Sequence, residues 1–162
     1  FDEMIEEEEN QQKQNDEQQS NIVTAAATAT TAPIDVVTVA TNDKKEVIFL
    51  IDGAGYAITT GIKGDIRIPF TGTITGVYLL ADQSGSIVID LWLDDQGAFP
   101  PTVADTITAS AKPTLSTATN SSDTTLTGWT TAVTAGDILR VNVDSCATCQ
   151  RVSLAIQFTR TA

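Results

Sequence analysis

The stretch RVSLAIQFTR, residues 151–160, decides the fold, because apolar and polar side chains alternate along it without interruption. Successive side chains of a β-strand point to opposite faces, so this period of two predicts a strand. One face should be buried in a core and the other wet. The expected buried row is Val152, Leu154, Ile156 and Phe158, and the expected wet row is Ser153, Ala155, Gln157 and Thr159.

Similar alternation recurs along most of the chain, with Gly, Pro, Asn and Asp at the breaks. We expect further strands at 34–40, 46–52, 65–70, 73–81, 87–93, 124–129 and 137–144. The proline-containing, Thr/Ser-rich stretch 99–120 is expected to be a long connection, because proline lacks the N–H that a strand ladder needs. The pattern predicts an all-β, jelly-roll-like antiparallel β-sandwich over residues 34–162, in which 34–60 could form a separate collar and 61–162 the core.

Three phrases within residues 63–160 resemble a C-terminal β-domain of tailed-bacteriophage and prophage virion proteins, of the fibre or capsid-decoration type. They are RIPFTGTITGVYLLADQSGSIVIDLW, FPPTVADTITASAKPTLS and DTTLTGWTTAVTAGDILRVNVDS. The resemblance implies a structural protein at the virion surface, with other virion proteins as partners. Because projecting phage fibres are commonly three-fold, it also implies a homotrimer.

The N-terminal region differs sharply from the rest in composition. Residues 1–20 hold eight acids and one base, out of a net charge of −12 for the chain. A segment with so few apolar residues cannot offset its own ordering entropy, so residues 1–33 are expected to be an extended arm and connector. Phe1, Met4 and Ile5 are the apolar anchors with which the arm would dock on the particle, and the alternative is a solubilising tail.

Composition also bears on partners. The bases are scattered singly through an acidic chain, whereas nucleic-acid phosphates and anionic lipids require clustered Lys or Arg. No apolar run approaches the length of a membrane span, which is about 18 residues or more. We therefore expect no nucleic-acid partner and no membrane insertion.

Catalytic and metal-binding patterns are weak. The chain has no histidine, which removes the commonest general base and metal ligand. Asp94 and Asp95 are the best local carboxylate pair, but adjacent strand residues point to opposite faces and an Asp-Asp-Gln-Gly run is typical of a turn. We expect no enzymatic activity, no metal and no cofactor.

Cys146 and Cys149 form the one C-x-x-C pair of the chain. A zinc site would need a second pair of ligands, and a redox C-x-x-C normally opens a helix rather than lying between two strands. We expect a hairpin loop in which the two cysteines could form a local disulfide.

Three aromatic residues, Trp92, Trp129 and Tyr78, are candidates for a subunit interface or for stacking against a host-surface glycan. Trp92 shares its side of the strand with Val88 and Asp90, so that side should be covered by another part of the sheet or by a neighbouring subunit. The glycan-binding alternative would make the domain the receptor-binding tip of a tail fibre.

Overall fold

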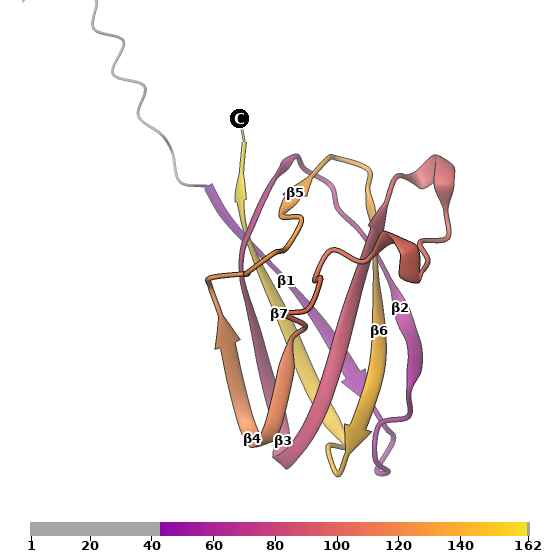
Figure 1. Ribbon diagram of the computed structural model, residues 1–162, viewed down its shortest axis with the longest axis vertical. Helices are drawn as coiled ribbons and strands as arrows, with labels where there is room; N and C mark the ends of the chain where they lie inside the picture. Colours follow the sequence, from indigo (N-terminus) through magenta and orange to yellow (C-terminus); the bar gives the residue numbers. More distant parts are fainter. Residues whose placement is uncertain (1–42, 162) are drawn as a thin grey trace, which may run out of the picture. The chain divides into compact units, whose positions relative to one another are not determined.

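The computed structural model describes residues 43–161, which form strands joined by turns and by one long connection over residues 95–113 (Figure 1). The elements are β1 (Asp43–Asp52), β2 (Gly61–Arg67), β3 (Gly72–Asp94), η2 (Gln96–Ala98), η3 (Val103–Asp105), β4 (Thr114–Asp123), β5 (Ala132–Val133), β6 (Ile138–Ala147) and β7 (Arg151–Arg160). Every pairing between these strands is antiparallel. The predicted all-β antiparallel fold is therefore confirmed.

The 23-residue strand β3 organises the sheet. Residues 72–81 of β3 pair with β7, whereas residues 86–94 pair with β6. The strand β4 runs antiparallel to both halves, and its register with β3 shifts between Leu80 and Gly85. Figure 1 shows β3 and β4 turning together at this point. Such an irregularity lets a strand bend, so a single ribbon of β3 and β4 serves both halves of the sheet.

The bend divides the sheet into two rows of strands. In the first row β1 pairs with β7, β7 with the first half of β3, and that half with the end of β4. In the second row β2 pairs with β6, β6 with the second half of β3, and that half with the start of β4. The pairing is thus nested: the first strand, β1, pairs with the last, β7, and β2 pairs with β6.

One hydrophobic core lies between the two rows. The predicted row Val152, Leu154, Ile156 and Phe158 of β7 is fully buried, at 0% exposure, which confirms the alternation. It packs in one cluster with buried residues of the second row, which are Leu139, Val141 and Val143 of β6 and Ile87, Ile89 and Leu91 of β3. Fully burying one such side chain stabilises the fold by roughly 1.5–3 kcal/mol.

The opposite side of β7 is less exposed to solvent than predicted. Ser153, Gln157 and Thr159 are half-buried, and Ala155 is buried. The reason is that β7 is flanked on both sides, by β1 and β3, so the small Ala155 lies between Ile48 and Tyr78.

Two predictions in the middle of the chain are wrong. The stretch expected as connection up to residue 120 becomes β4 from Thr114 onward, because its β-branched threonines suit a strand. The expected strand 124–129 is instead a turn region, where the carboxylate of Asp123 accepts the N–H groups of Thr125 and Leu126. Aspartate side chains commonly form such turns with the backbone that follows them.

The expected strand 46–52 is confirmed as part of β1, which begins three residues earlier. Asp43 and Lys44 are therefore strand residues. β1 pairs with β7 over its whole length, so residues 43–52 are a strand of the same sheet. The expected strand 34–40 and the arm 1–33 lie outside the described residues.

Candidate functional site

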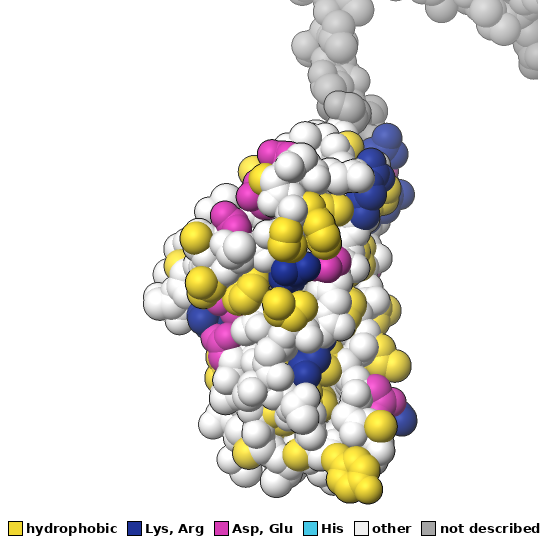
Figure 2. All heavy atoms as spheres, turned by 90° about the vertical axis from the view of Figure 1, so that its right-hand side faces the viewer, with side chains coloured by type: hydrophobic (Ala, Val, Ile, Leu, Met, Phe, Trp, Pro, Cys, Tyr) yellow, Lys and Arg dark blue, Asp and Glu magenta, His cyan; other side chains and the backbone are white. Residues whose placement is uncertain are grey.

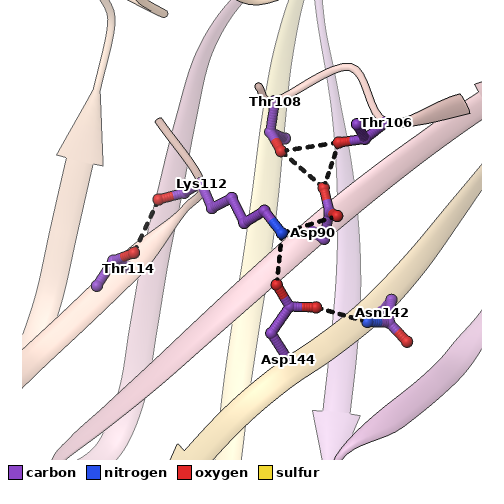
Figure 3. A network of polar contacts seen from close by, with 7 residues as sticks. All are labelled: Asp90, Thr106, Thr108, Lys112, Thr114, Asn142 and Asp144. Carbon is purple, nitrogen blue, oxygen red and sulfur yellow. Dashed lines mark hydrogen bonds and ion pairs between the residues drawn. The ribbon is translucent and has the colours of Figure 1, made fainter. Parts of the chain in front are cut away.

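A polar network on the outer side of the second row is centred on Asp90 of β3. Asp90 is 1% exposed, although it is an acid in a strand of apolar residues. Its Oδ1 accepts hydrogen bonds from the hydroxyls of Thr106, at 2.6 Å, and Thr108, at 2.7 Å. Its Oδ2 lies 3.0 Å from the Nζ of Lys112 (Figure 3). Both carboxylate oxygens of the buried acid therefore have partners.

Lys112 connects this buried acid to a second, more exposed one. Its Nζ lies 2.6 Å from Oδ2 of Asp144 on β6, and the amide of Asn142 donates to Oδ1 of Asp144 at 2.7 Å. The network thus joins β3, the connection between β3 and β4, and β6, as Figure 3 shows. The connection is held against the sheet by hydrogen bonds and ion pairs rather than by apolar packing alone.

In this network Asp90 and Lys112 stabilise each other's ionised forms. Burial by itself would raise the pKa of Asp90, but hydrogen bonds from Thr106 and Thr108 and the Lys112 ammonium outweigh it, so the pKa lies below its ordinary value of 3.8. The hydrogen bond to Asp144, followed by that to Asp90, raises the pKa of Lys112. Both groups are therefore ionised at neutral pH, as a paired buried charge requires.

Trp92 lies on the same side of β3 as Asp90. The sequence analysis expected this side to be covered by another part of the sheet or by a neighbouring subunit. In the structure, Thr106 of the connection pairs with Trp92 as an edge neighbour of β3. The side chains of Thr106, Thr108 and Lys112 then bind Asp90 on this side. The indole Nε1 of Trp92 is buried on this side and has no hydrogen-bond partner among the described residues.

The structure does not gather the three aromatic candidates into one site. Trp129 is a core residue, 9% exposed, whose Nε1 donates to the carbonyl of Ala111 at 2.8 Å. Trp92 is half-buried in the second row beside Thr106, whereas Tyr78 is half-buried in the first row beside Ala155. The buried ring of Trp129 is therefore not open for stacking.

An exposed aromatic cluster that the sequence analysis missed lies beside β2. The ring of Phe99 is 53% exposed, and Cζ of Arg140 lies 5.3 Å from its centroid. Arg140 binds Asp65 through two hydrogen bonds, of 2.7 and 2.9 Å, which raise the pKa of the guanidinium, and it donates to the carbonyl of Pro101. Figure 2, which faces the β2 side, shows hydrophobic side chains gathered around basic and acidic ones.

Sequence alone could not have found this cluster, because Phe99, Arg140 and Asp65 come from three separate segments. Asp90 did carry a sequence signal: it is an acid in the middle of the apolar run from Ile87 to Leu93. A buried strand tolerates such an acid when a base and hydroxyls lie nearby, and the pattern does not say which ones.

The cysteines lie at the turn between β6 and β7, as predicted, and both are free thiols. Cys146 Sγ lies 3.6 Å from the carbonyl oxygen of Cys149, and burial raises the pKa of the Cys149 thiol. A Cβ added at Gly85 would lie 2.5 Å from Cys149 Sγ, so the turn packs directly against the bend of β3. The arrangement is that of a packed turn.

Asp94 and Asp95 have the turn role that their sequence indicates. Asp95 accepts the N–H groups of Gly97 and Ala98 and so caps η2, while Asp94 accepts the N–H of Asp95. Among residues 43–161, no three His, Cys, Asp or Glu side chains form a group that could hold a metal ion. The predicted docking residues Phe1, Met4 and Ile5 lie outside the described residues.

No helix in the described part of the chain has the length and apolar character needed to cross a membrane. Comparison with family models, with curated proteins and with solved structures finds no match to this chain.

Proposed function

We propose that this chain is a non-enzymatic structural component of a bacteriophage virion, located at the particle surface. In this proposal the N-terminal arm docks on other virion proteins of the capsid or tail. The β-domain then projects outward as capsid decoration or as the head of a fibre. We interpret the nested pairing of its two rows as a jelly roll, a common arrangement in capsid domains.

One observation carries this proposal. The three phrases that resemble the phage family, residues 67–92, 99–116 and 123–145, are the segments that the polar network ties together. Asp90 lies in the first, Lys112 in the second and Asp144 in the third. The resemblance therefore coincides with a packed unit of the fold, and the contrast with the acidic residues 1–20 supports a division into a docking arm and a projecting domain.

The experiment uses particles that lack this protein. We expect full-length chain to co-sediment with them and a variant lacking residues 1–33 to remain in the supernatant, because docking is assigned to the arm. A full-length variant with Phe1→Ser, Met4→Ser and Ile5→Ser should attach more weakly, and attachment should fall as salt screens the arm's charge over about 8 Å. Circular dichroism of each variant verifies that the β-domain is folded.

Equal co-sedimentation of the full-length and truncated chains would contradict the arm's role. Failure of the full-length chain to bind any such particle would contradict the virion proposal itself.

The second candidate function, recognition of a host-surface glycan by a fibre tip, is favoured by one specific observation. Phe99 offers an exposed ring next to the Arg140–Asp65 pair, and sugars bind exposed aromatic faces flanked by polar groups. Here Phe99 takes the role first assigned to Trp92, Trp129 and Tyr78. A glycan array in which Phe99→Ala loses a signal that the native chain gives would favour this function over decoration.

The homotrimer implied by the resemblance stays a prediction. It rests on the three-fold symmetry of projecting phage fibres, and it was expected to bury the side of β3 that carries Trp92. On that side Thr106, Thr108 and Lys112 of the same chain already bind Asp90.

A further inference from the structure

The strand β1 is an open edge of the sheet. It pairs with β7 alone among the described strands, so the other side of its backbone has no strand beside it. An unpaired strand edge presents a row of N–H and C=O groups that can pair with a further strand. Soluble proteins usually protect such an edge with charged residues, prolines or bulges.

The middle of β1 lacks that protection. Its charged residues stand at the two ends, whereas the five residues from Val47 to Ile51 are all apolar. Ile48 is 65% exposed and Leu50 is 55% exposed, and β1 pairs with β7 without any register shift. A ten-residue edge with an apolar middle and a regular backbone is suited to strand addition.

The apolar character continues from this edge across the outer face of the first row. The pairing aligns Ile48 with Ala155 and Tyr78, and Leu50 with Ser153 and Leu80. Leu80 is 58% exposed. The exposed side chains of β1 thus belong to a patch that spans three strands, which we call the β1 patch: Ile48, Leu50, Tyr78, Leu80 and Ala155.

We propose that β1 binds β1 of a second copy of this chain, antiparallel and about a two-fold axis, with Ile48 opposite Ile48. The two first rows then form one continuous sheet, and the two β1 patches become a single apolar surface. The inference concerns self-association and is independent of the proposed virion role, but the dimer is an alternative to the homotrimer that the family resemblance implies.

The geometry of a two-fold axis limits the possible registers. An axis perpendicular to the sheet keeps each side chain on its own face, and directly opposed residues of an antiparallel pair share a face. One residue must therefore lie opposite its own copy. For a pairing that uses the apolar middle of β1, that residue is Val47, Ile48 or Phe49.

Charge selects among these three. With Ile48 at the centre, Lys44 of one copy lies opposite Asp52 of the other, and this happens twice because the interface is symmetric. With Phe49 at the centre, Glu46 would lie opposite Asp52, and like charges directly opposed across a strand pair are destabilising. With Val47 at the centre, Lys44 would face Leu50 and gain no partner.

The charge pattern also identifies a second copy as the partner. No ion pair to Lys44 occurs among the described residues, and Asp52 is half-exposed although it binds Arg151 at 3.1 Å. Lys44 and Asp52 stand four residues before and after Ile48 in the same strand. A second copy of β1 therefore offers an acid to Lys44 and a base to Asp52. A single edge contact buries less than a standard interface, so we expect affinity in the micromolar range.

Sedimentation equilibrium of the full chain tests the proposal. We expect a concentration-dependent species of twice the 17.1 kDa monomer mass. Ile48→Lys places two like charges opposite each other at the axis and should weaken the dimer by about 100-fold or more. Ile62→Lys is the matched control, because Ile62 is 53% exposed on β2 in the other row and should leave the dimer unchanged.

A native chain that stays monomeric at millimolar concentration, or that forms trimers, overturns the proposal. Equal weakening by Ile62→Lys does so as well. Thermal melts of both variants verify that each is folded.

Cross-linking tests the register separately. In a Cys146→Ser, Cys149→Ser background, Ile48→Cys should form a disulfide-linked dimer under mild oxidation, because residue 48 faces its own copy. Val47→Cys and Phe49→Cys face each other rather than themselves, so each alone should cross-link at least about tenfold less. Stronger cross-linking of either one than of Ile48→Cys overturns the register.

Discussion

The two outer faces of the domain differ in which side chains they bury and which they expose to solvent. Over the second row, side chains of the connection between β3 and β4 bury Asp90 to 1% exposure, with Thr106, Thr108 and Lys112 as its partners. Over the first row no described segment covers the β1 patch, and Ile48 and Leu80 remain more than half exposed. The covered face thus holds a charge and the open face holds aliphatic side chains.

This reversal shows that the burial of these outward-facing residues follows the side chains that pack beside them rather than their own polarity. A buried carboxylate is tolerated where a base and two hydroxyls satisfy it. Exposed aliphatic side chains are individually tolerated, but a contiguous patch of them commonly marks an interaction surface. The four predictions below test this comparison.

Removing the buried acid should have the largest effect. Asp90→Ala leaves the hydroxyls of Thr106 and Thr108 with only their 3.3 Å contact to each other, and it leaves Lys112 with Asp144 alone. We therefore expect the free energy of unfolding to fall by about 3 kcal/mol. Urea denaturation at neutral pH measures the change. Asp144→Ala is the control, because it removes the exposed acid of the same network and should cost no more than about 1 kcal/mol. Equal losses would show that burial does not distinguish the two acids.

The contribution of Asp90 should depend on pH. Its pKa in the folded chain lies below the ordinary value of 3.8, so its stabilisation is complete above that value and is lost as pH falls through the folded pKa. The stability gap between the native chain and Asp90→Asn should therefore be constant near neutral pH and shrink in acid. Urea titrations at a series of pH values measure it, and a gap that persists unchanged to about pH 2 would contradict the assignment.

Replacing the two thiols should have a smaller effect. Cys146→Ser with Cys149→Ser places a hydroxyl at a buried position, and we expect a loss of no more than about 2 kcal/mol with the fold retained. Thermal unfolding measures the change, and Cys146→Ser alone should account for the lesser part of it. Loss of soluble protein, or stoichiometric zinc in the native chain, would contradict the packed-turn interpretation.

The open face should be the least sensitive. Leu80→Thr replaces an exposed aliphatic side chain by a good strand former, so we expect a stability change within about 0.5 kcal/mol when the protein is dilute. Leu79→Ala on the adjacent, buried position should cost about 2–5 kcal/mol. A large loss from Leu80→Thr in dilute protein would indicate that the face is covered within a single chain.

Period-two alternation was sufficient to predict strands such as 151–160 and their buried rows, because which side chains share a face depends on local geometry alone. The same local pattern misjudged 114–123, whose Thr- and Ser-rich sequence becomes β4 by pairing with β3. It also could not identify the partners of Asp90, the pair of Phe99 with Arg140, or the open edge at β1. Each of these depends on contacts between segments far apart in the chain. The sequence alone therefore determined the strand class and the core rows, whereas the tertiary structure decided which faces are covered, because burial on an outer face depends on register and on where a distant connection lies.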